Sequence, residues 1–275
     1  MSLTAQFFAG DTDKLWTNVH GGGLGTHTGT PSNGSHLGAW QDEATPSTRN
    51  VSWQQLNSQT ASRPTFATPG AMLLPSVLFD GSEDGFNLSP NNGMGDLAAS
   101  DFLSVSAKTI VGSFRMTAAA TDNATIYRNS TIVADKGGYF GVFAKTSGGV
   151  HSLYAYNWDG NSDVTSGLTF SLNTDYVFLL RHNGSTLYLS LLSGAGGATR
   201  ADASVASGST TTLNDGMRLG RSGWTEYFTG AIGELYFDNT DLGSTNTPLT
   251  DIVGRWLPAA SPSINASQRM ISVAT

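Results

Sequence analysis

Short apolar runs separated by turn residues make up most of the chain from residue 72 onward. The clearest pair is Tyr176–Arg181 and Thr186–Leu191, joined by His182-Asn183-Gly184-Ser185. Asn-Gly supplies the positive φ angles of a tight turn, so this spacing predicts a β-hairpin. Repetition of such runs along one chain is typical of an antiparallel β-sandwich.

Other segments repeat the pattern and add one helix. Further strands are predicted from apolar runs bounded by turn residues at Ile110–Met116, Tyr139–Ala144, Val150–Trp158, Met217–Gly220 and Ala231–Phe237. The helix candidate is Thr250–Trp256, with Thr250 as its N-cap, Asp251 in the first turn and Pro258 after its end.

Composition agrees with an all-β protein that is not built for nucleic acid. Of the 275 residues, 33 are Gly and only 13% are charged, as expected of a turn-rich antiparallel fold. The formal net charge is −7, and the 14 Lys and Arg residues are scattered, so no basic surface for a phosphate backbone is expected. The absence of Cys excludes disulfides and thiolate metal sites.

Three parts are expected along the chain. Residues 1–50 form a Gly-rich N-terminal arm, in which Trp16 and Trp40 flank Gly21–His27 and hold the arm against the sandwich. Residues 51–258 form the sandwich domain, and residues 259–275 form a tail that packs as an extended arm or contacts a neighbouring subunit. No basic leader and no apolar run long enough for export or for membrane insertion is found, so we expect no signal peptide.

Several phrases occur in a fixed order along the chain. They are Trp40-Gln41-Asp42, Arg63-Pro64-Thr65, Phe79-Asp80-Gly81 with Asp84, Leu219-Gly220, Phe228–Glu234 and Trp256-Leu257. Over residues 12–257 the chain thereby resembles the concanavalin A-like, laminin-G-like jelly-roll domains of bacterial surface proteins and bacteriophage virions. The resemblance implies a two-sheet antiparallel jelly-roll sandwich with an N-terminal arm and a short C-terminal helix.

The opening stretch Leu15–Asp42 is similar to the version of this domain in phage structural proteins. The resemblance therefore implies a structural protein of the virion, as a capsid decoration, a head fibre or a tail-associated component. It also implies that the partners are other virion subunits, that the protein forms a homo-oligomer, and that one face binds host-surface glycans. Many copies on one particle would turn weak binding at each site into strong attachment. The alternative interpretation is a secreted bacterial carbohydrate-binding module or adhesin. A glycan-degrading enzyme is the third interpretation and ranks below both.

Catalytic patterns do not emerge from the sequence. The four glutamates are Glu43, Glu83, Glu226 and Glu234, and none lies in the Glu-x-Asp-x-x-Glu phrase that supplies paired carboxylates in β-glucanases. Glu83 and Asp84 are interpreted as part of a solvated turn beside Asp80. Nucleophile-elbow, Walker A and dinucleotide motifs are missing too, so a non-enzymatic protein is predicted.

A calcium site is the metal site that the sequence best supports. Asp159, Asn161 and Asp163 offer side-chain oxygens at alternate positions of a loop, as a hard cation requires. Val164 stands where an EF-hand needs Gly, so a hairpin loop rich in Asp and Asn is the other interpretation. Asp80 and Asp84 form a second candidate, whereas His20, His27 and His36 lack the spacing of a zinc site.

Glycan binding needs aromatic faces beside planar polar groups. Trp158 beside Asp159 and Asn161, and Trp224 with Tyr227, meet that need and are the candidate ligand-binding residues. Packing of these aromatic side chains in the core is the alternative interpretation.

Overall fold

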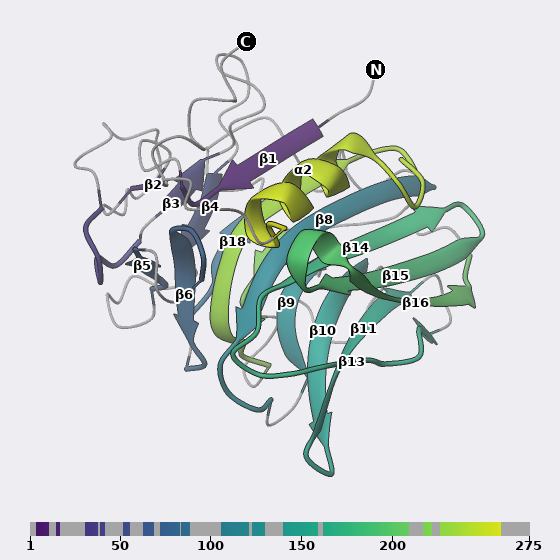
Figure 1. Cartoon of the computed structure of the whole chain (residues 1–275), viewed down its shortest axis with the longest axis horizontal. Helices are drawn as coiled ribbons and strands as arrows, with labels where there is room; N and C mark the ends of the chain where they lie inside the picture. Colours follow the sequence, from purple (N-terminus) through teal and green to yellow (C-terminus); the bar gives the residue numbers. More distant parts are fainter. Residues whose placement is uncertain are drawn as a thin grey trace.

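The structure is a computed structural model of the whole chain, in which two antiparallel β-sheets pack face to face (Figure 1). It describes residues 4–10, 15–16, 31–37, 39–41, 52–55, 63–68, 72–82, 84–88, 106–120, 123–129, 140–158, 162–208, 217–221 and 226–259. The predicted all-β sandwich with two antiparallel sheets and one short C-terminal helix is confirmed. Among the described residues, no helix has the length and apolar character needed to cross a membrane.

The first sheet has eight strands. Its order is β16 (Thr199–Ala206), β15 (Thr186–Ser193), β14 (Tyr176–Asn183), β8 (Ala107–Met116), β18 (Thr229–Asp238), β6 (Ser76–Asp80) and β5 (Thr65–Ala67). The eighth strand, β1 (Thr4–Phe8), pairs with the second half of β18, while β6 pairs with the first half. Two strands from distant parts of the sequence, β1 and β6, therefore share β18 as their partner.

The second sheet has ten strands. Its order is β12 (Ser162–Val164), β11 (Val150–Trp158), β10 (Phe140–Ser147), β9 (Ala124–Asn129), β17 (Met217–Leu219), β7 (Phe86–Leu88), β4 (Ser52–Gln55), β3 (Ala39–Gln41) and β2 (Leu15–Trp16). The tenth strand, β13 (Leu168–Phe170), pairs with β11 beside β12.

Two strands predicted from neighbouring apolar runs pair as the hairpin β10–β11, and the predicted hairpin forms as β14–β15. The turn chemistry of the second differs from the prediction, because Gly184 has a positive φ of 100° and Asn183 does not. Asn183 acts through its side chain instead, and its Oδ1 accepts the backbone N–H groups of Ser185 and Thr186 at 3.1 and 2.9 Å. Asn-Gly therefore makes the turn with one left-handed residue and one side-chain cap.

The core between the sheets is rich in aromatic rings. Phe114 lies against Phe170, Tyr176 and Phe178 at centroid distances of 5.9, 5.7 and 6.2 Å. A second group joins Phe79 to Phe86 and Phe228. Trp40 is fully buried in the same core, so β3 is part of the sandwich.

The helix α2 (Thr247–Trp256) lies across the outer face of the eight-stranded sheet (Figure 1). It begins three residues before the predicted start, because Asn246 and not Thr250 is the N-cap. The Oδ1 atom of Asn246 accepts the Leu249 N–H at 2.8 Å, and Thr250 Oγ1 donates to the Asn246 carbonyl. The apolar side of α2 buries Leu249, Ile252, Val253 and Trp256 against the sheet.

Glu234 ties three elements together beneath α2. Its carboxylate is fully buried and accepts hydrogen bonds from Gln6 Nε2, from Arg255 Nε and Nη2, and from Trp256 Nε1, at 2.5–2.9 Å. The neighbouring Gly233 lies directly under the indole of Trp256, where a Cβ atom would come within 2.0 Å of the ring. The Phe228–Glu234 phrase of the sequence therefore has a structural role, because it seats β1 and α2 on β18.

The expected arm also supplies β1 and β2, whereas Gly21–His27 lies outside the described residues. Of the expected tail, only Ala259 is described. The domain limits at residues 50 and 258 stay predictions.

Candidate functional site

A groove of about 270 Å³ lies on the outer face of the ten-stranded sheet, over β9 to β12. Its lining residues come from four neighbouring strands, from the residue before β9 and from the segment before β18: Asn123, Thr125, Tyr127, Arg128, Gly141, Val142, Phe143, Tyr156, Val164 and Glu226. The alternation of each strand decides which side chains face the groove. On β10, Phe140, Val142 and Ala144 point into the core, so Gly141 and Phe143 face outward.

Gly141 forms the floor of the groove. It lies between Arg128 on β9 and Tyr156 on β11 in one cross-strand row, which Val164 on β12 extends. The missing side chain leaves a depression between the two large neighbours. A Cβ at this position would also lie 2.6 Å from the carbonyl oxygen of Tyr127, so close approach of the backbone requires glycine.

Aromatic side chains form one side of the groove. Phe143 and Tyr154 are cross-strand partners whose rings stack at 5.3 Å with an interplanar angle of 11°. Tyr156, two residues along the same strand, is half-buried, and Val164 keeps 39% of its surface exposed. An accessible apolar surface of this kind suits the C–H faces of a sugar ring.

A charged pair forms the other side. Arg128 Nη1 lies 3.0 Å from Glu226 Oε2, and about a quarter of each side chain is exposed. The pair offers N–H donors and carboxylate acceptors side by side without net charge. With Thr125 and Asn123 nearby, this side can exchange hydrogen bonds with hydroxyl groups.

The structure places Tyr227 next to the groove residue Glu226. Tyr227 is half-buried, and the guanidinium of Arg221 lies 5.5 Å from its ring centroid. Trp158 is the last residue of β11 and pairs with Ser162, and nothing is described of its side chain. Asp159, Asn161 and Trp224 lie outside the described residues, so these binding assignments stay predictions.

The predicted calcium loop is described at one of its three ligands. Asp163 lies on β12 opposite Asn157 and is half-buried. Within the described part of the chain, no group of three or more His, Asp or Glu side chains is arranged to hold a metal ion. Calcium binding by Asp159, Asn161 and Asp163 stays a prediction.

The turn after β6 differs from the interpretation as a solvated turn. Asp80 is exposed and accepts from Ser82, but Asp84 is only 3% exposed and its Oδ2 accepts the Asp80 N–H at 2.9 Å. Its Oδ1 has no hydrogen-bond partner among the described residues. Burial raises the pKa of Asp84 from its ordinary 3.8 to about 7, and the nearby Asp80 carboxylate adds to the rise.

This burial predicts a pH dependence that Asp84→Asn removes. Because the folded protein holds the Asp84 proton more tightly than the unfolded chain, the stabilisation is present below pH 4 and is lost as the pH rises through 7. Between pH 4 and pH 7 we expect the free energy of unfolding of the wild type to fall by about 2–4 kcal/mol relative to that of Asp84→Asn. Urea unfolding of both proteins across this pH range measures the difference. If the free energy of unfolding varied with pH in the same way for both proteins, burial of Asp84 would not be the cause.

Sequence reasoning missed the groove residues. A usable signal was present, because Tyr154 and Tyr156 alternate with the core residues Leu153 and Ala155, which places two aromatic side chains on the outer face. The approach of Arg128 and Glu226, 98 residues apart, had no comparable signal.

Comparison with known proteins supports the fold. The sequence matches no known protein family and no curated protein. Among solved structures, the chain is similar to the enzymatically active domain of bacteriophage CBA120 tailspike protein 2, with a TM-score of 0.51 and 9% identity over 79% of this chain and 32% of that one. It is also similar to a mutant GH54 α-L-arabinofuranosidase, with a TM-score of 0.55 and 11% identity over 84% of this chain and 54% of that one.

A CBM40 domain of the Ruminococcus gnavus IT-sialidase, bound to α2,3 sialyllactose, aligns with a TM-score of 0.47 and 15% identity over 65% of this chain and 95% of that one. The chain thus spans about a third of the tailspike domain and about half of the arabinofuranosidase. At these identities the likeness concerns the jelly-roll-like β-sandwich fold.

Proposed function

We propose that this protein is a non-enzymatic, glycan-binding component of a bacteriophage particle. The observation that carries the proposal is the groove over β9 to β12, which sets aromatic rings opposite a neutral ion pair. The similarity of the fold to a phage tailspike domain supports a place on the virion, tail-associated or as a head fibre or capsid decoration.

In the proposed complex, the C–H face of a sugar ring packs on Phe143 and Tyr156 above Gly141. The sugar hydroxyls exchange hydrogen bonds with Arg128 and Glu226. The groove is open and short, so the affinity of one site is low, and many copies on a particle supply strong attachment. Contacts with other virion subunits and self-association into a homo-oligomer belong to the same proposal.

The charged groups of the groove support binding without hydrolysis. Glycoside hydrolysis uses two carboxyl groups that flank the scissile bond. Among the described lining residues the groove has one carboxylate, Glu226, and Arg128 is paired with it. A groove with these groups is suited to holding a glycan.

Truncating the aromatic side of the groove tests the binding step. We expect a glycan array to identify a bound oligosaccharide, and Tyr156→Ala and Phe143→Ala each to weaken its binding about tenfold, or ~1.4 kcal/mol, by removing the stacking surface. Isothermal titration calorimetry measures the affinity. Asp251→Asn, on the exposed side of α2, is the matched control and should bind as wild type does. Unchanged affinity in both groove variants would refute the assignment of the groove.

The location is tested separately. Mass spectrometry of purified phage particles should find the polypeptide in many copies. Its copy number relative to the major capsid protein distinguishes a capsid decoration from a tail-associated protein or a fibre. Absence from particles would favour the secreted carbohydrate-binding module or adhesin, for which the same groove would serve.

A further inference from the structure

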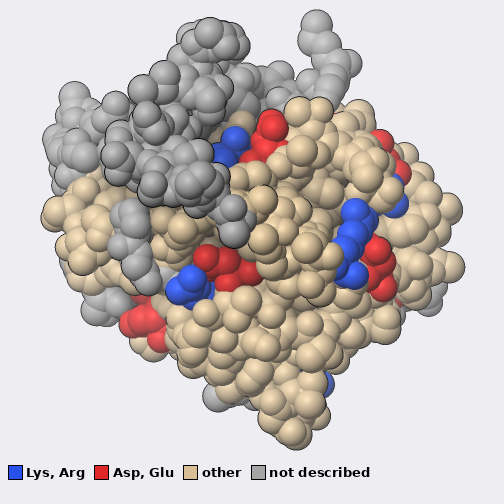
Figure 2. Space-filling model, in the orientation of Figure 1, with Lys and Arg blue, Asp and Glu red and all other residues tan. Residues whose placement is uncertain are grey.

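A second hollow, of about 480 Å³, lies on the opposite face of the sandwich, over β14 to β16. It is bounded by the segment between β18 and α2, and it is lined by Arg181, Tyr188, Leu189, Ser190, Arg200, Asp202, Ala203, Ser204 and Ser244. Figure 2 shows that this face of the molecule is largely uncharged, and that positive and negative side chains gather side by side over these strands.

The outer face of the eight-stranded sheet changes character where α2 no longer covers it. Under α2 the outward residues are apolar, among them Val177 and Leu179. One cross-strand row farther along β14, the outward residues are Arg181, then Tyr188 on β15 and Ser204 on β16. These polar side chains are therefore presented on a rigid sheet and not on a loop.

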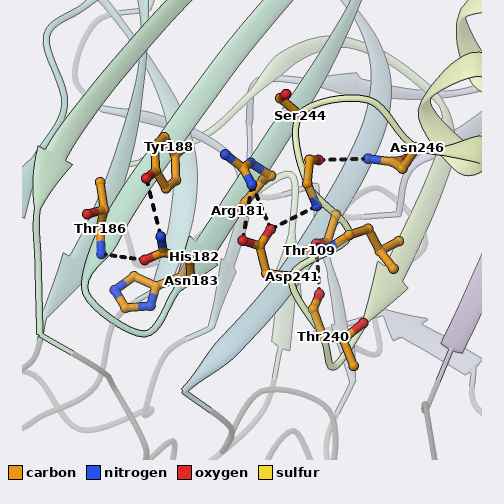
Figure 3. A network of polar contacts seen from close by, with 12 residues as sticks. Thr109, Arg181, His182, Asn183, Thr186, Tyr188, Thr240, Asp241, Ser244 and Asn246 are labelled. Carbon is orange, nitrogen blue, oxygen red and sulfur yellow. Dashed lines mark hydrogen bonds and ion pairs between the residues drawn. The ribbon is translucent and has the colours of Figure 1, made fainter.

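Arg181 is held in one orientation. Its Nη1 contacts both oxygens of Asp241 at 2.8 and 3.1 Å, and its guanidinium lies 4.2 Å from the ring centroid of Tyr188 (Figure 3). Asp241 also accepts the N–H of Gly243, and the Tyr188 hydroxyl accepts from Asn183. Arg181, which lines the hollow, is thus fixed by Asp241 and Tyr188 before any ligand arrives.

Asp202 forms the opposite side together with Arg200 and Ser190. Ser190 Oγ donates to Asp202 at 2.5 Å, Arg200 Nε donates to Asp202 at 2.9 Å, and Arg200 Nη2 lies 2.9 Å from Ser190 Oγ. Arg200 Nη1 also donates to the carbonyl of Ser244 across the hollow. Burial opposes ionisation here, but the hydrogen bonds and the nearby Arg181 hold the pKa of Asp202 below its ordinary value, and 59% of its side chain stays exposed as an acceptor.

The charges in the hollow cancel. Arg200 is paired with the lining carboxylate Asp202, and Arg181 is paired with Asp241 behind the lining, so neither guanidinium offers an anion an uncompensated positive charge. What remains is a dense set of fixed donors and acceptors beside a tyrosine ring. Vicinal hydroxyl groups, each of which donates and accepts, match such a set.

We propose that this hollow is a second carbohydrate site, specific for an uncharged mono- or disaccharide. The ligand's adjacent hydroxyls bind between Asp202 and Arg181, with Ser204 at the open edge. Because the two sites lie on opposite faces of the sandwich, one molecule would bind two glycans at once.

Side-chain NMR tests the site with defined sugars. Glucose, galactose, maltose and lactose are titrated into ¹⁵N-labelled protein to millimolar concentrations, with N-acetylneuraminic acid as the acidic counterpart, while the Nε–H signals of Arg181 and Arg200 are followed. We expect at least one uncharged sugar to shift these signals with a millimolar Kd. Asp202→Asn should weaken that binding about tenfold, since it removes the negative charge and replaces one of the two acceptor oxygens with an NH₂ donor.

Two bulky substitutions locate the binding. Ser204→Tyr fills the hollow from an exposed position and should abolish the titration, whereas Thr199→Tyr, exposed on the same strand and outside the hollow, should leave it unchanged. The proposal is overturned if no uncharged sugar shifts the arginine signals, if N-acetylneuraminic acid binds more tightly than every uncharged sugar, or if binding survives Ser204→Tyr. Tyr156→Ala separates the two sites, because it disables the groove and should leave this titration intact.

Discussion

Glu234→Gln is expected to lower the free energy of unfolding by about 3–5 kcal/mol, the usual cost of breaking a buried ion pair from one side. The carboxylate accepts four hydrogen bonds, and it is fully buried while its partner Arg255 is 22% exposed. An amide would turn an N–H group toward donors from Arg255, Trp256 or Gln6. The loss should therefore loosen α2 and β1 from β18 together.

Urea unfolding followed by circular dichroism measures the change. Asp251→Asn is the control, because that carboxylate is exposed on the same helix, and we expect it to change stability by less than about 0.5 kcal/mol. A loss below about 1 kcal/mol for Glu234→Gln would show that the buried network adds little beyond packing.

Trp256→Ala is expected to lower the free energy of unfolding by about 3–5 kcal/mol, as other removals of large aromatic side chains from a core do. The indole is 1% exposed, lies edge-on to Phe8 at 6.3 Å and covers Gly233. Its removal leaves a cavity between α2 and the sheet and also deprives Glu234 of one donor.

Gly233→Ala supplies the matched test of this contact. In the wild type its new methyl group would be driven into the Trp256 ring, so we expect a clear loss of stability. In the Trp256→Ala background the space is open, and the same substitution should cost much less. Equal costs in both backgrounds would mean that the indole does not confine Gly233.

Local features of the fold were predictable from the sequence. The hairpins β10–β11 and β14–β15 are formed by neighbouring segments whose turn residues identify them. The predicted start of α2 is three residues too late because Thr250 is an acceptable cap, although Asn246 followed by Pro248 in the first turn is the stronger start signal.

Non-local features were not predictable. The groove depends on the register that aligns Arg128, Gly141 and Tyr156. The sequence of one segment alone does not determine the register between strands that are distant along the chain. Asp84 belongs to a turn that its composition marks as solvated, yet the surrounding strands bury it. Lys108 is likewise fully buried, with its ammonium 4.7 Å from the ring centroid of Phe140. It faces inward with Ile110 on β8, but the predicted strand begins only at Ile110.

The position of β1 on β18 sets an order of events during synthesis. Gln6 and Glu234 are 228 residues apart, so β1 gains its partner only after the ribosome has also synthesised β18. At the usual rate of 5–20 residues per second, that delay is roughly 10–50 s. Throughout that interval Thr4–Phe8 lacks its native partner on β18, and a nascent chain with an unpaired strand is prone to pair with its neighbours. When several nascent chains lie close together, β1 of one copy can therefore pair with β18 of another before its own β18 has been synthesised.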